Sequence, residues 1–417
     1  MPLALQAAPN QYFGACGATD ADLNGVGLKI TRLTINWAVV QPTAGGSYNW
    51  NATGNDASDS VVGFLLDDAV ARDVLLIAGA KWPKWTGSDP NGTADDPTAA
   101  EVATFAKAAA QHYYGLRNKK IYMEIMNEPD GMLSGTPTQN GTLYKSILQQ
   151  SKTQIRSVLT ASQVAIVGVV LSGTPWMGNA PDIDTFWTTI TTGTNPVQNN
   201  MDIISYHIYT IPPLGLADVP PEVGSTRSGP LLDKLTNSKT LIDATGFGGA
   251  VWASEGGWPT QAGEKNEVTE AQQARWLVRM AVIGKGFGLN RFTMFRFQDT
   301  GNLYYGLRKA DNTNKLSYDA YKTMCGVLDS TISAVTKQSY STTGVCKYKY
   351  TKSNGDYGYI VWDVPEGSSA TVGLSVGTNG HLYKKTLRQP ATWTDLGIHS
   401  GTYNVTATPD PIYIEVR

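Results

Sequence analysis

Eight short runs of apolar and β-branched residues alternate with helix-like patterns between about residue 10 and residue 325. Strands covered on both faces of a parallel sheet read as such continuous apolar runs. Eight strand–helix repeats predict an α/β fold, a closed (β/α)8 or TIM barrel. The predicted strands span residues 11–15, 32–36, 74–78, 120–126, 164–171, 203–209, 250–254 and 291–297.

Helix-like segments separate these strands, at 59–72, 98–114, 142–160, 230–244, 270–284 and 318–329. An open, doubly wound sheet is the structural alternative. It is disfavoured because no glycine-rich phosphate-binding turn follows the first strand.

The pattern changes beyond residue 330, where helical periodicity stops and six strand-like runs follow one another between turn residues. We therefore predict a catalytic-size barrel over 10–328 and an antiparallel β-sandwich over 329–417, which residues at the N-terminus could join. The runs lie at 345–350, 357–364, 370–376, 381–385, 401–405 and 412–416.

The composition argues against three classes of protein. Charged residues make up only 16% of the 417, the net charge is −2 and no basic run occurs, so nucleic acid is not an expected partner. The 20 Tyr and 11 Trp argue against disorder. No stretch of 18 apolar residues occurs, so no membrane span is expected. Low charge with many Thr, Ser and Gly favours a secreted or extracellular protein, with residues 1–9 as the stub of a removed signal peptide.

Cysteine and histidine are sparse. Three cysteines make no disulfide framework, and Cys325 and Cys346 could form one bridge or stay as thiols. The four histidines show no ligand spacing, so we expect no metal and no cofactor. The acidic stretch 88–97 could hold Ca²⁺, although a solvated loop ending in a helix cap is favoured.

Polar side chains collect where the predicted strands end. Asn127 and Glu128 follow the fourth strand, and Glu255 follows the seventh. Because the carboxyl ends of barrel strands meet at one face, the two glutamates are predicted to face each other across the barrel mouth. Glycoside cleavage needs such a pair, one carboxyl to protonate the leaving oxygen and one carboxylate at the anomeric carbon.

These motifs resemble clan A, the large group of retaining glycosidases built on (β/α)8 barrels. The resemblance rests on Asn-Glu-Pro at 127–129 with the second glutamate, on His-Ile-Tyr at 207–209 and on Pro-Lys-Trp at 83–85. Segments 271–280 and 295–307, with the appended β-domain, look like family 39 of that clan.

The resemblance implies roles for individual residues. Glu128 would be the acid/base, Glu255 the nucleophile, and Asn127 a hydrogen-bond partner of the sugar 2-hydroxyl. Tyr209 would orient Glu255, and His207 would lie near the acid/base or a sugar hydroxyl.

Arg32 matches the strand-two arginine of the clan, which lies close to the nucleophile and keeps it ionised. Core packing or a plain buried ion pair is the alternative for Arg32, for His207 and for Tyr209. Glu124 is predicted to be structural, on the other face of its strand or paired with a lysine, and Asp299 could fix a loop or bind a hydroxyl.

The aromatic residues show one departure from the clan. A tryptophan often ends strand eight as the floor of the −1 subsite, whereas here Phe295 or Phe297 must substitute, or Arg296 must point inward. Tryptophans in loops after strands are suited to stacking on sugars. We expect two or three of five to do so, with barrel-rim packing as the alternative: Trp37, Trp82, Trp85, Trp176 and Trp258.

The sequence thus predicts a secreted retaining glycoside hydrolase that acts on a polysaccharide or oligosaccharide, with endo action slightly favoured, and the resemblance implies that the bonds are β-linkages. An exo-acting enzyme such as a β-xylosidase is the alternative within this class. A non-catalytic carbohydrate-binding protein on a decayed barrel is the alternative from another class. A barrel lyase or isomerase for phosphorylated compounds is disfavoured because Trp258 and Pro259 follow the two glycines after strand seven.

Overall fold

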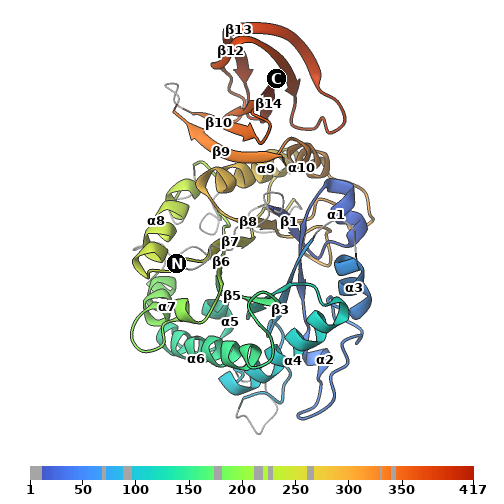
Figure 1. Cartoon of the computed structure of the whole chain (residues 1–417), viewed down its shortest axis with the longest axis vertical. Coiled ribbons are helices and arrows are strands. Elements are labelled where there is room, and N and C mark those ends of the chain that lie inside the picture. Colours follow the sequence, from blue (N-terminus) through green and yellow to red (C-terminus); the bar gives the residue numbers. More distant parts are fainter. Residues whose placement is uncertain are drawn as a thin grey trace.

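The predicted parallel barrel is confirmed. The computed structural model describes residues 12–67, 72–87, 96–172, 181–210, 219–223, 229–260, 267–328, 331–339 and 344–417. Strands β1 to β8 pair in chain order and close on themselves, since β1 pairs with both β2 and β8. Figure 1 shows the helices around these strands. They are β1 (Phe13–Cys16), β2 (Ile30–Thr34), β3 (Asp73–Ala78), β4 (Ile121–Ile125), β5 (Val164–Leu171), β6 (Ile203–His207), β7 (Ala250–Glu255) and β8 (Arg291–Met294).

The long helices begin at strong sequence signals. Thr98, Thr136 and Thr269 each form a capping box, in which the threonine side chain and the side chain three residues later satisfy each other's backbone N–H groups. The six predicted helices correspond to α3 (Asp59–Asp67), α4 (Ala99–Arg117), α6 (Pro137–Arg156), α8 (Leu231–Ala244), α9 (Glu270–Phe287) and α10 (Leu316–Val327). Four more were not predicted: α1 (Asp20–Val26), α2 (Trp37–Val40), α5 (Pro129–Met132) and α7 (Pro181–Thr191).

The C-terminal region is antiparallel, as predicted, and forms one six-stranded sheet in the order β13-β12-β14-β11-β10-β9. Two predicted runs join into the single long strand β12, and β9 was not predicted. The first half of β12 and the second half of β13 pack in one apolar cluster with β11 and β14, so the long hairpin folds over the sheet. The strands are β9 (Ile332–Gln338), β10 (Val345–Lys352), β11 (Tyr357–Asp363), β12 (Ala370–Lys385), β13 (Thr394–Ala407) and β14 (Ile412–Val416).

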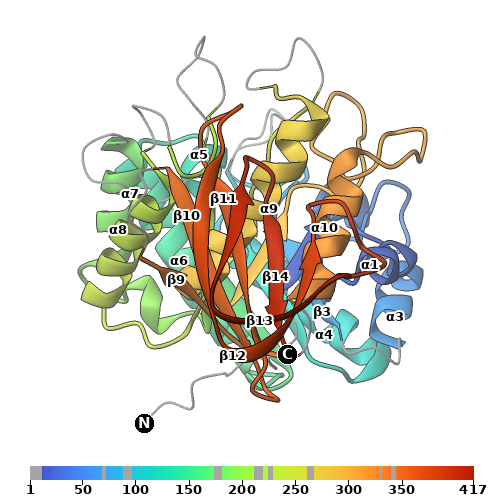
Figure 2. The ribbon, with the colours of Figure 1, turned by 90° about the horizontal axis from the view of Figure 1, so that it is seen from above.

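The C-terminal sheet packs on the barrel helices α9 and α10, as Figure 1 and Figure 2 show from two directions. Its contact face carries four large aromatic side chains that are at most 2% exposed, namely Tyr348, Tyr350, Trp362 and Tyr413. These rings belong to the same apolar cluster as the buried residues of the two helices. Barrel and sheet therefore share one core.

Cys16, Cys325 and Cys346 are free thiols, so the bridge considered between the last two is not formed. Across the described part of the chain, no helix has the length and apolarity needed to cross a membrane. Some expectations fall outside the described residues: the signal-peptide stub at 1–9, most of the acidic stretch 88–97, and Trp176.

Candidate active site

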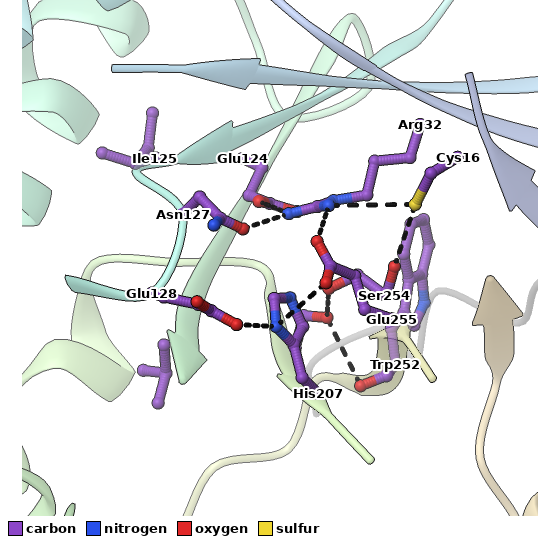
Figure 3. Close-up of polar contacts among 12 residues, drawn as sticks. Cys16, Arg32, Glu124, Ile125, Asn127, Glu128, His207, Trp252, Ser254 and Glu255 are labelled. Atoms are coloured by element: carbon purple, nitrogen blue, oxygen red, sulfur yellow. Dashed lines mark hydrogen bonds and ion pairs between the residues drawn. The ribbon is translucent and has the colours of Figure 1, made fainter. Parts of the chain in front are cut away.

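Arg32 lies at the centre of a cluster of polar side chains inside the barrel mouth (Figure 3). Its Nε donates to Glu124 Oε2 at 2.9 Å, its Nη1 to Glu255 Oε1 at 2.5 Å, and its Nη2 to Asn127 Oδ1 at 2.6 Å. Arg32 is 4% exposed, and these hydrogen bonds tie strand β2 to the ends of β4 and β7. Its planar set of five donors suits this task, because it meets several oxygens in fixed directions.

Glu255 is held by donors on two sides. Arg32 binds one carboxylate oxygen, and the Tyr209 hydroxyl donates to Oε2 at 2.8 Å. A register shift between Tyr206 and His207, opposite Ala253 and Glu255, inserts one extra residue into β7 at this point. Such bulges re-aim side chains next to functional sites.

The surroundings of Glu255 favour its ionised form. Burial, with 7% of the residue exposed, would raise the pKa of the carboxyl. The positive charges of His207 and Arg32, with hydrogen bonds from Tyr209 and Arg32, outweigh burial and lower this pKa below its usual value. Burial and then the charge of Glu255 raise the pKa of Tyr209, so its hydroxyl stays protonated and donates.

Glu128 has a different environment. Its side chain is 28% exposed, and it contacts His207 Nδ1 through Oε1 at 2.5 Å. His207 is fully buried, and its Nδ1 also lies 3.5 Å from Glu255 Oε2. Burial would lower the pKa of His207, but the charge of Glu255 and the hydrogen bond to Glu128 raise it. His207 thus lies between the two carboxylates, and they favour its protonated form.

The two glutamates meet across the barrel mouth, as the strand positions predict. One carboxylate oxygen of Glu128, one of Glu255 and one ring nitrogen of His207 lie within 4.8 Å of one another. Carboxyl groups of retaining glycosidases are about 5–5.5 Å apart, and those of inverting enzymes about 6.5–9.5 Å. The oxygen spacing of Glu128 and Glu255 is thus at or below the shorter of these two ranges.

The same three side chains form the one group in the described chain with a spacing that could hold a metal ion. The guanidinium of Arg32 lies 2.5 Å from Glu255 Oε1, and its positive charge opposes a cation at this position.

The expectation for Glu124 needs correction. Its carboxylate is 0% exposed and pairs with Arg32 through both oxygens, so it lies inside the barrel and its partner is not a lysine. Arg32 therefore bridges two buried carboxylates, Glu124 and Glu255. Glu124 is the site-lining residue that the sequence reasoning missed, and its position four residues before Glu128 on an interior strand was the available signal.

The described tryptophans divide into two groups. Trp37 and Trp258 are each 1% exposed, so neither ring offers a face to a sugar, and we correct the expectation for both. Trp37 stacks on Phe105 in the core at 4.6 Å between centroids. Trp82 and Trp85 are half-buried in the loop after β3 and remain candidates for sugar contacts.

The end of β8 clarifies the departure from the clan pattern. Phe297 is 0% exposed, whereas Phe295 is half-buried and its ring lies 6.5 Å from that of Tyr209. The ring centroid of Tyr305, a residue that the sequence did not single out, lies 5.4 Å from that of Phe295. Asp299 accepts from Gly306 N at 2.7 Å and from Lys315, so it fixes this loop.

Comparison with known proteins agrees with this architecture. Residues 8–281 match the model of the family described as cellulase (glycosyl hydrolase family 5). No curated protein matches the sequence. A family 39 glycoside hydrolase from the gut symbiont Bacteroides cellulosilyticus WH2 has a similar structure, with a TM-score of 0.73 and 15% identity over 100% of this chain and 83% of that one.

Two further solved structures are similar along nearly their whole length. A GH30 endoxylanase from Clostridium papyrosolvens C71 has a TM-score of 0.64 and 12% identity, covering 99% of this chain and 98% of that chain. A bifunctional glucanase-xylanase from a metagenome library has a TM-score of 0.64 and 13% identity, covering 98% and 96%. At these identities the structures speak for the fold, and the family match carries the assignment. The chain belongs to the cellulase family of glycoside hydrolases, glycosyl hydrolase family 5, within the clan that its motifs indicate.

Proposed function

We propose that the protein is a retaining glycoside hydrolase that cleaves β-glycosidic bonds of a polysaccharide by double displacement. The observation that carries the proposal is the pair of carboxylates with oxygens within 4.8 Å and unequal surroundings. Glu255 is buried and bound by Arg32 and Tyr209, whereas Glu128 is open to solvent on one side. Unequal surroundings are what a proton donor and a nucleophile require.

In the first step a Glu255 oxygen attacks the anomeric carbon, and the bond from that carbon to the leaving oxygen breaks. Glu128 gives its proton to the leaving oxygen, which departs as a hydroxyl group. The Asn127 side-chain oxygen accepts from Arg32, which leaves the amide N–H groups free to donate to the sugar 2-hydroxyl.

In the second step Glu128, now a carboxylate, takes a proton from water. The water oxygen attacks the anomeric carbon, the ester bond to Glu255 breaks, and the product keeps the original anomeric configuration. His207 contacts Glu128 throughout and lies between the two carboxylates. We assign it to holding Glu128 in place and to limiting repulsion between the carboxylates.

We further propose that the substrate is a β-linked polysaccharide attacked internally. Half-buried Trp82 and Trp85 supply aromatic surface, and Phe295 supplies the floor beside the nucleophile. The structurally similar endoxylanase and glucanase-xylanase suggest xylan and β-glucan as first substrates to test. An exo-acting β-xylosidase is the alternative, and release of only monosaccharide from xylan would favour it. We place the enzyme outside the cell because polysaccharides of this kind are extracellular and the chain carries little charge.

Glu255→Ala tests the nucleophile. Turnover of an aryl β-glycoside found in a substrate panel should fall by more than about a thousandfold, because the covalent intermediate cannot form. Added azide should restore product as a glycosyl azide of inverted configuration. Glu270→Ala, which removes a surface glutamate paired with Lys309, is the control and should leave turnover unchanged. A fully active Glu255→Ala enzyme would refute the assignment.

Two other readings are tested with the native protein. A carbohydrate-binding protein would show heat of binding to oligosaccharides in calorimetry without turnover of any substrate. The mechanism above uses no metal, so dialysis against a chelator should leave activity unchanged. Loss of activity that Zn²⁺ or another divalent ion restores would instead assign a metal to Glu128, His207 and Glu255.

A further inference from the structure

The hydrogen-bonded ladder between β4 and β5 ends just before the proposed acid/base. Its last described pair is Glu124 with Val167. On the other side of β5, Gly168 pairs with Ile204 of β6, and the next pair is Leu171 with Tyr206. Between these pairs β5 therefore carries one residue more than β6. This bulge includes Val169, whose φ of 58° is rare for a β-branched residue.

The hydroxyl of Tyr144 fills this break in the ladder. Tyr144 comes from α6 and is 0% exposed. Its hydroxyl donates to the carbonyl of Ile125 at 3.1 Å and accepts from the N–H of Val169 at 2.9 Å. One side chain thus satisfies a carbonyl at the end of β4 and an N–H in the bulge of β5, two buried groups that would otherwise need partners.

The backbone beyond the break is also unusual. Met126 and Glu128 have positive φ angles of 65° and 43°, and they flank Asn127. Two residues further on, Asp130 accepts from the Ser172 N–H at 3.0 Å and from the Ser172 hydroxyl at 2.6 Å. The segment that carries Asn127 and Glu128 is therefore held at both ends to the far end of β5. Left-handed residues persist where surrounding contacts determine them.

We propose that Tyr144 and Asp130 are positioning residues for general acid catalysis, acting through the backbone on Glu128. The inference rests on the proposed function of Glu128. Neither side chain contacts the substrate in this scheme. Tyr144 fixes where β4 ends, Asp130 fixes the turn after Glu128, and together they determine where the carboxyl oxygen meets the leaving group.

Substrates with different leaving groups test this inference. Dinitrophenolate departs without a proton, whereas a sugar or alkyl leaving group needs one. Tyr144→Phe and Asp130→Asn should each lower kcat/KM, which reports the first step, about tenfold or more for the sugar leaving group and change it by less than about twofold for the dinitrophenyl glycoside. Glu128→Ala removes the acid altogether, so it gives the largest selective loss with which the other variants are compared. Ser172→Ala removes one partner of Asp130 and serves if Tyr144→Phe does not fold.

Tyr113→Phe is the matched control, because Tyr113 is also fully buried and donates to a carbonyl, that of Ala57, away from the site. It should affect both substrates alike. If Tyr144→Phe and Asp130→Asn also lower kcat/KM for both substrates by one factor while Glu128→Ala is selective, the positioning inference is wrong and the proposed function stands. If Glu128→Ala itself is not selective, the proposed role of Glu128 fails first.

Discussion

The charge state of Glu255 depends on a few neighbouring side chains, and the hydroxyl of Tyr209 is the one that can be removed most cleanly. Tyr209→Phe keeps the ring but deletes the 2.8 Å hydrogen bond to Glu255. Because the pKa of Glu255 is lowered in the native protein, its reactive carboxylate is lost only as pH falls through that low value. Deleting the donor raises this pKa, so the acidic limb of the pH–rate profile should move to higher pH.

The same substitution should lower kcat/KM about 10- to 100-fold, the range expected for a hydrogen bond to a charged group. Tyr206→Phe is the control. Tyr206 precedes His207 in β6, so its side chain lies on the face of the strand opposite to that of His207. An unshifted acidic limb in Tyr209→Phe would show that the hydroxyl does not help to keep Glu255 ionised.

We propose that Arg32 contributes both to stability and to catalysis, and a pair of variants separates the two contributions. Arg32→Met leaves Glu124 buried without its partner and should lower the free energy of unfolding by about 3–5 kcal/mol. Adding Glu124→Met removes one of the two buried carboxylates that Arg32 pairs with, so stability measured by denaturant unfolding should recover in part. Activity should not recover, because Glu255 still lacks its guanidinium. Recovery of both would mean that Arg32 serves stability alone.

Residue partners were the hardest feature to predict from the sequence. The meeting of Glu128 and Glu255 could be predicted because strand ends meet at one face of a barrel, whatever the loops do. The partner of Glu124 could not, because it comes from another strand 92 residues away. Trp37 was assigned to sugar binding on its loop position, but stacking on Phe105 buries it. The position of a residue on a strand or helix predicts which way its side chain points, whereas the burial of that side chain depends on the residues that pack against it.

Among the elements, α6 links the outer layer to the proposed site because it carries Tyr144. Its first turn is capped by Thr136, which accepts from Gln139 N, while the Gln139 side chain accepts from Thr136 N at 2.9 Å. Thr136→Ala should lower the free energy of unfolding by about 1 kcal/mol. Thr142→Ala, on an exposed position of the same helix, should change it by less than about 0.5 kcal/mol. Equal losses in urea unfolding would argue against the cap.

The predicted elements succeeded where burial imposes a pattern. Barrel strands are covered on both faces, so β5 reads Val-Ala-Ile-Val-Gly-Val-Val-Leu and is found with the predicted bounds. Helix α1 was not predicted although it starts at a capping box. With only seven residues, it is too short to show apolar residues repeating over two helical turns. Strand β9 is exposed along much of its length, and Thr, Lys and Gln hide its apolar positions.

At the scale of the whole molecule, barrel and C-terminal sheet share a charged junction as well as a core. Arg279 of α9 is 0% exposed and donates to the carbonyl of Asp363 at 3.1 Å and to that of Pro409. Trp362 of β11 donates to Glu222 Oε1 at 2.7 Å, and Glu222 lies between β6 and α8. Both domains therefore lose buried partners when they separate.

The shared core predicts that the two domains unfold together. Differential scanning calorimetry of the full chain should show one transition, and Trp362→Phe should lower its midpoint without splitting it. The predicted boundary near residue 328 would then separate two parts that differ in architecture but unfold as one unit. Two transitions separated by several degrees would show that the sheet is an independent unit.

Double displacement by Glu255 and Glu128 fixes the configuration of the first product, so that configuration is the decisive measurement. Proton NMR should follow hydrolysis of a β-linked substrate by the native enzyme at early times, before mutarotation. With double displacement, the β-anomer should appear first and the α-anomer should form later by mutarotation. An α-anomer formed first would mean a single displacement by water and would contradict the roles assigned to both glutamates.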